Sequence, residues 1–177
     1  STSMSNEARL AHWENEFKEW EHHKNRESSS GVGSTVQNTI RTIETLTEVI
    51  TSLKIESLVD LPCGDLNWMS KALAKWPGLN YTGMDISPLL IARNRKLFPT
   101  LRFHAHDIVL NKLPLNTELI LNRDMLFHLS PADGVKALQN IACCSRYLLS
   151  STFPAGSNTA VEIQAGDGGA VFYRINL

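Results

Sequence analysis

The sequence predicts an α/β protein whose mostly parallel, doubly wound sheet carries helices on both faces. Two observations lead to this fold class. Short apolar runs of strand length alternate along the chain with longer runs of helical period. The predicted strands also end at or shortly before acidic residues, which are Asp60, Asp85, Asp107 and Asp124. Because the carboxyl ends of parallel strands meet at one edge of a sheet, we expect these four carboxylates to converge on one crevice.

Length and composition suit one folded domain with its own core, since the chain has 177 residues, 42% of them hydrophobic and 20% charged. A net charge of −1 argues against a broad nucleic-acid-binding surface, although a local basic patch stays possible. We expect a helical extension at residues 1–30 and a ligand-binding domain at residues 31–177. The sequence does not indicate whether the protein is a monomer or an oligomer.

Neither a membrane segment nor a metal site is expected. No apolar run approaches the roughly 18 residues of a spanning helix, and no secretory leader is visible at the N-terminus. The three cysteines, of which Cys143 and Cys144 are adjacent, form neither a disulfide framework nor a zinc-ligand pattern. We therefore expect a cytoplasmic protein.

The N-terminal segment is predicted to be helical over residues 6–27, because large apolar residues recur there at three- and four-residue steps. Two interpretations stay open for this helix: it packs on the domain, or it acts as a lid over a ligand. His22 and His23 are not expected to bind a metal together, because adjacent side chains point to different faces of a helix. We expect both to be solvated. A polar stretch at residues 28–35 then leads into an amphipathic helix at 36–53, capped by Ser34 or Thr35.

The most informative stretch is residues 57–68, which read as a short strand ending at Asp60, a tight turn and the start of a helix at Trp68. Gly64 has no side chain, so a ligand or another peptide can come close to the turn. Asp65 or Asn67 is expected to cap the helix, which runs to about Trp76. Open α/β sheets bind nucleotide-like ligands at such a turn.

A second strand at residues 80–85 ends at Asp85, and Pro88 opens the following helix. An acid in this position can accept hydrogen bonds from both hydroxyls of a ribose. The dinucleotide fingerprint needs three glycines at the first turn, whereas this turn has only Gly64, with Asp60 and Asp65 close by. These acids would repel a phosphate and suit a cation attached to a nucleoside. The pattern therefore points to S-adenosylmethionine.

The rest of the chain continues the alternation. Residues 101–108, 118–122 and 146–153 read as three further strands, with a helix from Pro131 to about Ile141 before the last of them. His104 and His106 share one face of the third strand and are expected to be packed or surface histidines. The chain after Pro154 reads as a loop up to Gly169, followed by the start of a final strand.

These motifs resemble those of class I S-adenosylmethionine-dependent methyltransferases. The resemblance is to a group with an Asp-x-Pro-Cys-Gly-Asp-Phe-Asn-Trp first turn, which reads here from Asp60 to Trp68 with Leu66 in place of Phe. It extends to residues 31–35, 83–86, 122–129 and 147–154. It implies a Rossmann-like methyltransferase sheet with S-adenosylmethionine as cofactor. The related Gly-Asp-Trp-Arg-Pro-Leu-Asn-Leu pattern is interrupted by an insertion, so we expect the closing hairpin to be incomplete.

The resemblance also implies roles for individual residues. Asp60, Gly64 and Asp65 would hold the methionine end of the cofactor, Asp85 the ribose and Asp107 the adenine. Ser34 or Thr35 would hydrogen-bond the cofactor from a loop that crosses it, although Gly31 and Gly33 can equally form a simple hinge. Trp68 would pack beside the turn, and Asn122 would border the methyl group. The remaining residues assigned to the cofactor site are Cys63, Asn67, Ile86 and Ile108.

Arg123, Asp124 and His128 would face the methyl acceptor and are the candidate catalytic residues. His128 lies four residues after Asp124, so the two would share a face if the segment between them is helical. Such a pair can orient an acceptor or remove its proton. Alternatively, Arg123 and Asp124 form a structural ion pair, and His128 caps or packs.

The predicted function is methyl transfer from S-adenosylmethionine to an unidentified acceptor, with a small molecule favoured over protein or nucleic acid on charge. The alternative is a catalytically inactive methyltransferase-like domain that binds a ligand or a partner. A nicotinamide-dependent oxidoreductase is disfavoured by the missing glycines.

Overall fold

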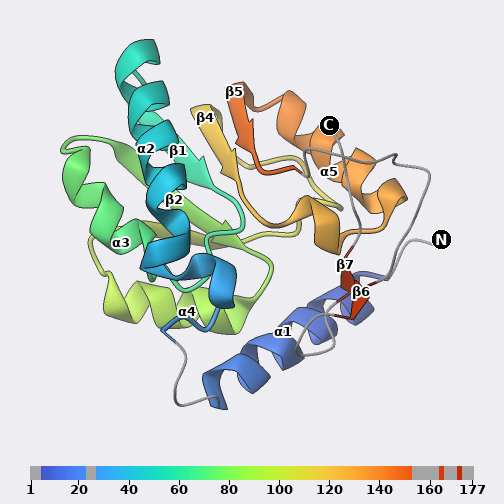
Figure 1. Ribbon diagram of the computed structural model, residues 1–177. Helices are drawn as coiled ribbons and strands as arrows, with labels where there is room; N and C mark the ends of the chain where they lie inside the picture. Colours follow the sequence, from blue (N-terminus) through green and yellow to red (C-terminus); the bar gives the residue numbers. More distant parts are fainter. Residues whose placement is uncertain (1–4, 23–26, 153–163, 166–170, 173–177) are drawn as a thin grey trace.

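The computed structural model describes residues 5–22, 27–152, 164–165 and 171–172, and for residues 20–22, 164–165 and 171–172 only the backbone. Five parallel strands form the central sheet in the order β3-β2-β1-β4-β5 (Figure 1). The strands are β1 (Ser57–Asp60), β2 (Asn80–Asp85), β3 (Arg102–Ala105), β4 (Thr117–Asn122) and β5 (Ser145–Ser150). The strand order reverses between β1 and β4, which is where ligands bind in open α/β sheets.

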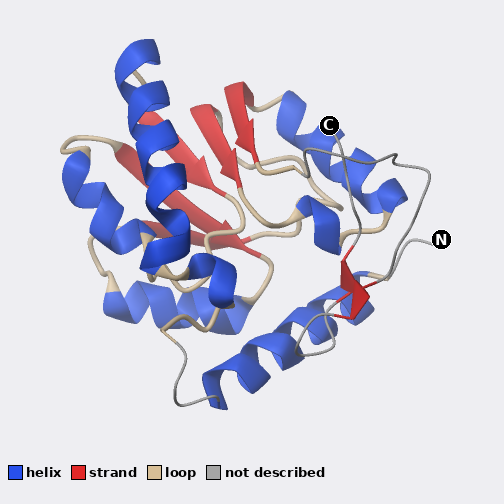
Figure 2. Ribbon diagram, viewed as in Figure 1, coloured by secondary structure: helices blue, strands red, loops and turns tan. Residues whose placement is uncertain are grey.

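Helices cover both faces of the sheet, which confirms the predicted fold class (Figure 2). One face packs against α2 (Val36–Leu53), α3 (Met69–Ala72) and α4 (Pro88–Leu97), and the other packs against α5 (Pro131–Ala142). Alternate residues of β1 point to opposite faces of the sheet. Leu58 packs in the core under α2, α3 and α4, and Val59 packs in the core under α5. The connection from β3 to β4 contains no helix, and Ile108, Val109 and Leu113 of this loop fill the core beside α5 instead.

Polar residues that precede prolines or apolar runs begin the longer helices. Thr35 caps α2 by accepting a hydrogen bond from the Asn38 N–H, as predicted. Ser87 and Ser130 cap α4 and α5, each followed by a proline at the first helical position. The predicted caps of α3 are wrong, because Trp68 occupies that position and makes no side-chain capping hydrogen bond.

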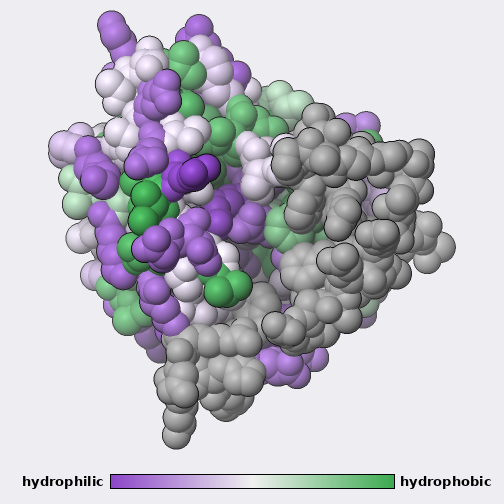
Figure 3. All heavy atoms as spheres, in the orientation of Figure 1, coloured by the Kyte–Doolittle hydropathy of each residue, from purple (hydrophilic) through white to green (hydrophobic). Residues whose placement is uncertain are grey.

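The outer surface of α2 is mainly hydrophilic with scattered hydrophobic residues (Figure 3). Ile40 and Leu53, near the two ends of α2, are 42% and 43% exposed, whereas Leu46 and Ile50 are buried. Within the described residues, no helix is long and apolar enough to cross a membrane.

Several predicted bounds need correction. The first helix, α1 (Asn6–His22), ends five residues before Glu27, and β3 ends at Ala105, so His106 and Asp107 follow the strand. β6 (Gln164–Ala165) and β7 (Val171–Phe172) pair antiparallel as a separate two-stranded sheet. The predictions for the loop around residues 155–163, for Gly166-Asp167 and for residues 173–177 lie outside the described residues.

Candidate functional site

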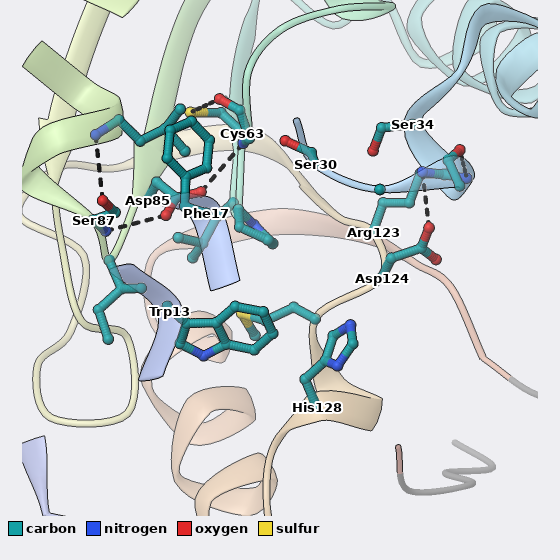
Figure 4. A pocket seen from close by; sticks show the side chains of 18 of the residues that line it. Trp13, Phe17, Ser30, Ser34, Cys63, Asp85, Ser87, Arg123, Asp124 and His128 are labelled. Carbon is teal, nitrogen blue, oxygen red and sulfur yellow. Dashed lines mark hydrogen bonds and ion pairs between the residues drawn. The ribbon is translucent and has the colours of Figure 1, made fainter. Parts of the chain in front are cut away.

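A cavity of about 840 Å³ lies at the carboxyl edge of the sheet. One wall is this edge, formed by the ends of β1 and β2 and by the residues that follow β1, β2, β3 and β4. The opposite wall is formed by α1 and by residues 27–35, which together we call the cover. Figure 4 shows Asp85 and Arg123 on opposite sides of the open space, with Trp13 and His128 along another side.

The first turn depends on a glycine because another segment comes close to it. Gly64 has a φ of +56, and a Cβ built there would lie 2.5 Å from Ser30 Oγ. The Ser30 hydroxyl accepts a hydrogen bond from the Asp65 N–H at 2.8 Å. The turn is therefore clamped by the cover, while the Gly64 N–H donates to Asp85 Oδ2 at 3.2 Å.

Asp85 ends β2 at the cavity wall, as predicted. Its carboxylate accepts hydrogen bonds from the N–H groups of Gly64 and Ser87. Burial raises its pKa to about 6, and these backbone hydrogen bonds limit the rise. A carboxylate held in this way faces the cavity ionised at neutral pH and can accept further hydrogen bonds from a ligand.

Asp60 ends β1 deeper in the wall and is only 2% exposed. The Tyr81 hydroxyl donates a hydrogen bond to its Oδ2 at 2.9 Å. Burial raises the pKa of Asp60 to about 7, more than the Tyr81 hydrogen bond lowers it. Close to neutral pH this group therefore exists in both protonation states.

Asp107 reaches the cavity from the loop after β3 and is ion-paired with the cover. Arg9 of α1 donates to Asp107 Oδ2 from Nη2 at 2.8 Å and from Nε at 3.2 Å. The other oxygen, Oδ1, accepts from the Val109 N–H. Arg9 also lies 3.8 Å from Asp133, and all three side chains are nearly buried. This ion pair holds α1 against the sheet edge.

On the far side of the cavity, Arg123 pairs with Asp124 at 2.8 Å and donates to the Gly33 carbonyl at 2.9 Å. Its guanidinium also lies over the Trp68 ring, 6.0 Å from the centroid. Asp124 Oδ1 accepts from the Ser151 hydroxyl. Arg123 thus links the end of β4 to the cover.

Asp124 and His128 were expected to lie on one face of a helix, but no α-helix connects them. Asp124 has a left-handed backbone, with φ +56, and only Leu126–His128 form a short 3-10 turn. Asp124 turns to Arg123, whereas the His128 ring packs edge-on against Trp13 with 4.9 Å between centroids. The geometry matches the alternative of a structural ion pair beside a packed histidine, although all three candidate catalytic residues line the same cavity.

Three residues predicted for the site make other contacts. Asp65 accepts hydrogen bonds from the Ser28 hydroxyl and the Ser29 N–H, and Asn67 donates to Glu27 and to the Ser34 carbonyl. Asn122 is 1% exposed and donates to the Leu61 carbonyl. They position the first turn and the strand ends, and none of the three lines the cavity. The predicted cofactor-site residues that do line it, besides Asp60, Asp85 and Asp107, are Ser34, Thr35, Cys63, Gly64, Trp68, Ile86 and Ile108.

Sequence reasoning missed the cavity residues of α1. Trp13 and Phe17 belonged to the predicted apolar stripe, but the stripe did not show that they face a cavity. The sequence analysis assigned no role to Arg9 and Glu16, yet they are only 3% and 8% exposed. Their positions, four residues before and three after Trp13, place them on the same helix face, and this spacing was the available signal.

No protein-family model matches the chain, and no curated protein matches it significantly. Several solved structures, in contrast, match it over much of its length. The magnesium protoporphyrin IX methyltransferase ChlM of Synechocystis PCC 6803, with bound S-adenosylmethionine, matches with a TM-score of 0.60, 14% identity and coverage of 87% of this chain and 79% of that one. The N-methyltransferase NodS of Bradyrhizobium japonicum WM9, with S-adenosylhomocysteine, matches with a TM-score of 0.57 and 16% identity. The match covers 74% of this chain and 68% of NodS.

PigF with S-adenosylhomocysteine matches with a TM-score of 0.53 and 16% identity over 62% of this chain. The chain spans only 34% of PigF. The fold is the class I methyltransferase fold. At these identities the likeness extends to the fold alone.

Proposed function

We propose that the chain is an S-adenosylmethionine-dependent methyltransferase that acts on a small-molecule acceptor. The observation that carries the proposal is the convergence of three acids on one cavity beside the Gly64 turn: Asp60 and Asp85 from the ends of β1 and β2, and Asp107 from the loop after β3. Together with the methyltransferase fold, this arrangement suits a nucleoside that carries a positive charge.

The residues present fit such a cofactor. Asp85 offers ionised oxygens for the ribose hydroxyls, because its pKa of about 6 leaves it charged at neutral pH. Asp60 lies near the turn, where a carboxylate favours an ammonium or a sulfonium group. Asp107 keeps its oxygens at the cavity wall, where the resemblance places the adenine amino group. When bound, S-adenosylmethionine supplies an electrophilic methyl group for in-line attack by a nucleophile.

The protein's own part in the reaction is alignment and exclusion of water. Arg123 and Trp68 fix the wall after β4, and the cover closes the cavity on the opposite side. A cavity of about 840 Å³ lies in the upper part of the range of ~300–1,000 Å³ for small-molecule sites, which leaves room for a small acceptor beside the cofactor. Holding two reactants in line lowers the entropic cost of their encounter.

Residues 1–30 are proposed to act as a lid over residues 31–177. The support is that α1 contributes Arg9, Trp13, Glu16 and Phe17 to the cavity and is fastened by the buried Arg9–Asp107 pair. A cytoplasmic location belongs to the same proposal, supported by the three free cysteines.

The second candidate is a binding domain without turnover. It is favoured by the Asp124 and His128 side chains, which are engaged by Arg123 and Trp13 rather than arranged as an acid–base pair. Incubation with S-adenosylmethionine labelled in its methyl group and with a fractionated cell extract separates the two candidates. Label transferred to an extract component supports the enzyme, whereas cofactor binding without any transfer supports the binding domain.

A further inference from the structure

Glu16 is a buried carboxylate at the cavity, and its Oε2 atom accepts no hydrogen bond from the residues that the structure describes. Glu16 lies on the inner side of α1 and lines the cavity, and it is 8% exposed. The Oε2 atom is itself buried. An unpaired buried carboxylate costs free energy, so such a group in a ligand cavity is a candidate contact for a ligand.

The other carboxylates at the cavity already have partners. Asp107 and Asp124 are paired with arginines, Asp85 accepts backbone N–H groups and Asp60 accepts the Tyr81 hydroxyl. Glu27 accepts hydrogen bonds from the Val36 N–H and the Asn67 amide. Within the part of the chain that the structure describes, Glu16 therefore differs from every other acid that lines the cavity.

The surroundings of Glu16 suit a cation. Trp13, one helical turn earlier, and Phe17, the next residue, bring aromatic rings to the same cavity. Aromatic faces next to a carboxylate attract alkylammonium groups. Burial raises the pKa of Glu16, and nearby His12 lowers it in part. A positively charged ligand group would favour the ionised form of this carboxylate.

The position of Glu16 points to the acceptor. The Trp13 ring contacts His128 in the segment after β4, which the resemblance places beside the acceptor. The Asp85 and Asp107 side chains, proposed for the nucleoside, come from the β2 and β3 side of the sheet, which α1 contacts through Arg9 and Phe17 rather than through Trp13. We infer that the acceptor carries a primary or secondary amine, and that Glu16 binds this amine in its charged form. An ammonium group has no lone pair, so in this arrangement it anchors the acceptor, and another group of the acceptor is the nucleophile that takes the methyl group. The inference rests on the proposed function.

The test uses Glu16→Gln, which keeps the size of the side chain and removes its charge, with Glu7→Gln at an exposed position of α1 as the matched control. Calorimetry first measures the binding of S-adenosylhomocysteine to each protein. Transfer of labelled methyl groups is then measured with the small-molecule fraction of a cell extract, before and after its amines are acetylated with N-acetoxysuccinimide.

We expect Glu16→Gln to bind S-adenosylhomocysteine within twofold of the wild type and to raise the apparent KM for the extract about tenfold, the range of a lost hydrogen bond to a charged group. Glu7→Gln should match the wild type, and acetylation should remove most of the transfer. Transfer that survives acetylation, or an unchanged KM in Glu16→Gln, overturns the inference and leaves the methyltransferase proposal standing. Loss of S-adenosylhomocysteine binding in Glu16→Gln assigns the residue to the cofactor and also overturns the inference. Absence of transfer to the untreated extract counts against the proposed function itself, and the inference then fails with it.

Discussion

The two walls of the cavity are built in different ways. At the sheet edge, Asp60 and Asp85 are terminal residues of strands, and their oxygens are held by Tyr81 and by backbone N–H groups. The cover is attached by side chains far away in the sequence, chiefly Arg9 with Asp107 and Asp65 with Ser28 and Ser29. The edge is thus a property of the sheet, whereas the cover depends on a few polar contacts. Substitutions should therefore separate ligand binding from attachment of the cover.

The largest effect on ligand binding is expected at the sheet edge. Asp85→Ala should weaken S-adenosylmethionine binding by at least about 100-fold, because hydrogen bonds to a charged group contribute about 1.5–3 kcal/mol each. Calorimetric titration measures the loss, and circular dichroism checks that the fold is kept. Asp85→Asn, which preserves the shape of the side chain, guards against misfolding of the alanine variant. Wild-type affinity in both variants would remove Asp85 from the site.

Arg9→Gln tests the cover. It leaves Asp107 and Asp133 buried beside a neutral side chain, and loss of one partner of a buried ion pair typically costs about 3–5 kcal/mol. We expect a lower free energy of unfolding in urea and faster proteolysis within α1. Lys18→Gln, at an exposed position on the same helix, should have little effect. Equal stability of the Arg9 and Lys18 variants would show that the ion pair does not fasten α1.

The buried acids of the edge predict a pH dependence of stability. The pKa of Asp60 is about 7 in the folded chain and near 3.8 when unfolded, so the native state holds more protons between these values. Stability should therefore fall as the pH rises from 5 to 8, by about 2–3 kcal/mol from Asp60, with Asp85 acting in the same direction. Thermal unfolding of Asp60→Asn should show a flatter pH profile than the wild type. Parallel profiles for the two proteins would contradict the assignment.

The smallest effect is expected where the cover joins α2. Thr35→Ala removes the N-cap of α2 and should cost about 1 kcal/mol of unfolding free energy. The matched control is Thr45→Ala, at an exposed position inside the same helix. Urea denaturation of both variants measures the difference, and a cost as large in Thr45→Ala would rule out a capping contribution.

The same contrast explains what the sequence could predict. The five strands, the terminal acids Asp60 and Asp85 and the start of α2 follow from local patterns, and the structure confirms them, whereas β3 ends two residues before Asp107. Arg9 and Asp107 are 98 residues apart, so no local pattern predicts their ion pair. Asp65 was expected to cap α3, but Ser28 and Ser29 bind its carboxylate from another part of the chain. The Asp124–His128 prediction assumed a helix that the left-handed backbone at Asp124 does not allow.

The central claim is that the carboxylates of the sheet edge form a site for a positively charged nucleoside. Calorimetric titration of the unmodified chain with S-adenosylmethionine, and separately with NADH, tests this claim most directly. We predict binding of one S-adenosylmethionine per chain and no binding of NADH. Absence of binding for S-adenosylmethionine, or binding of NADH alone, would contradict it.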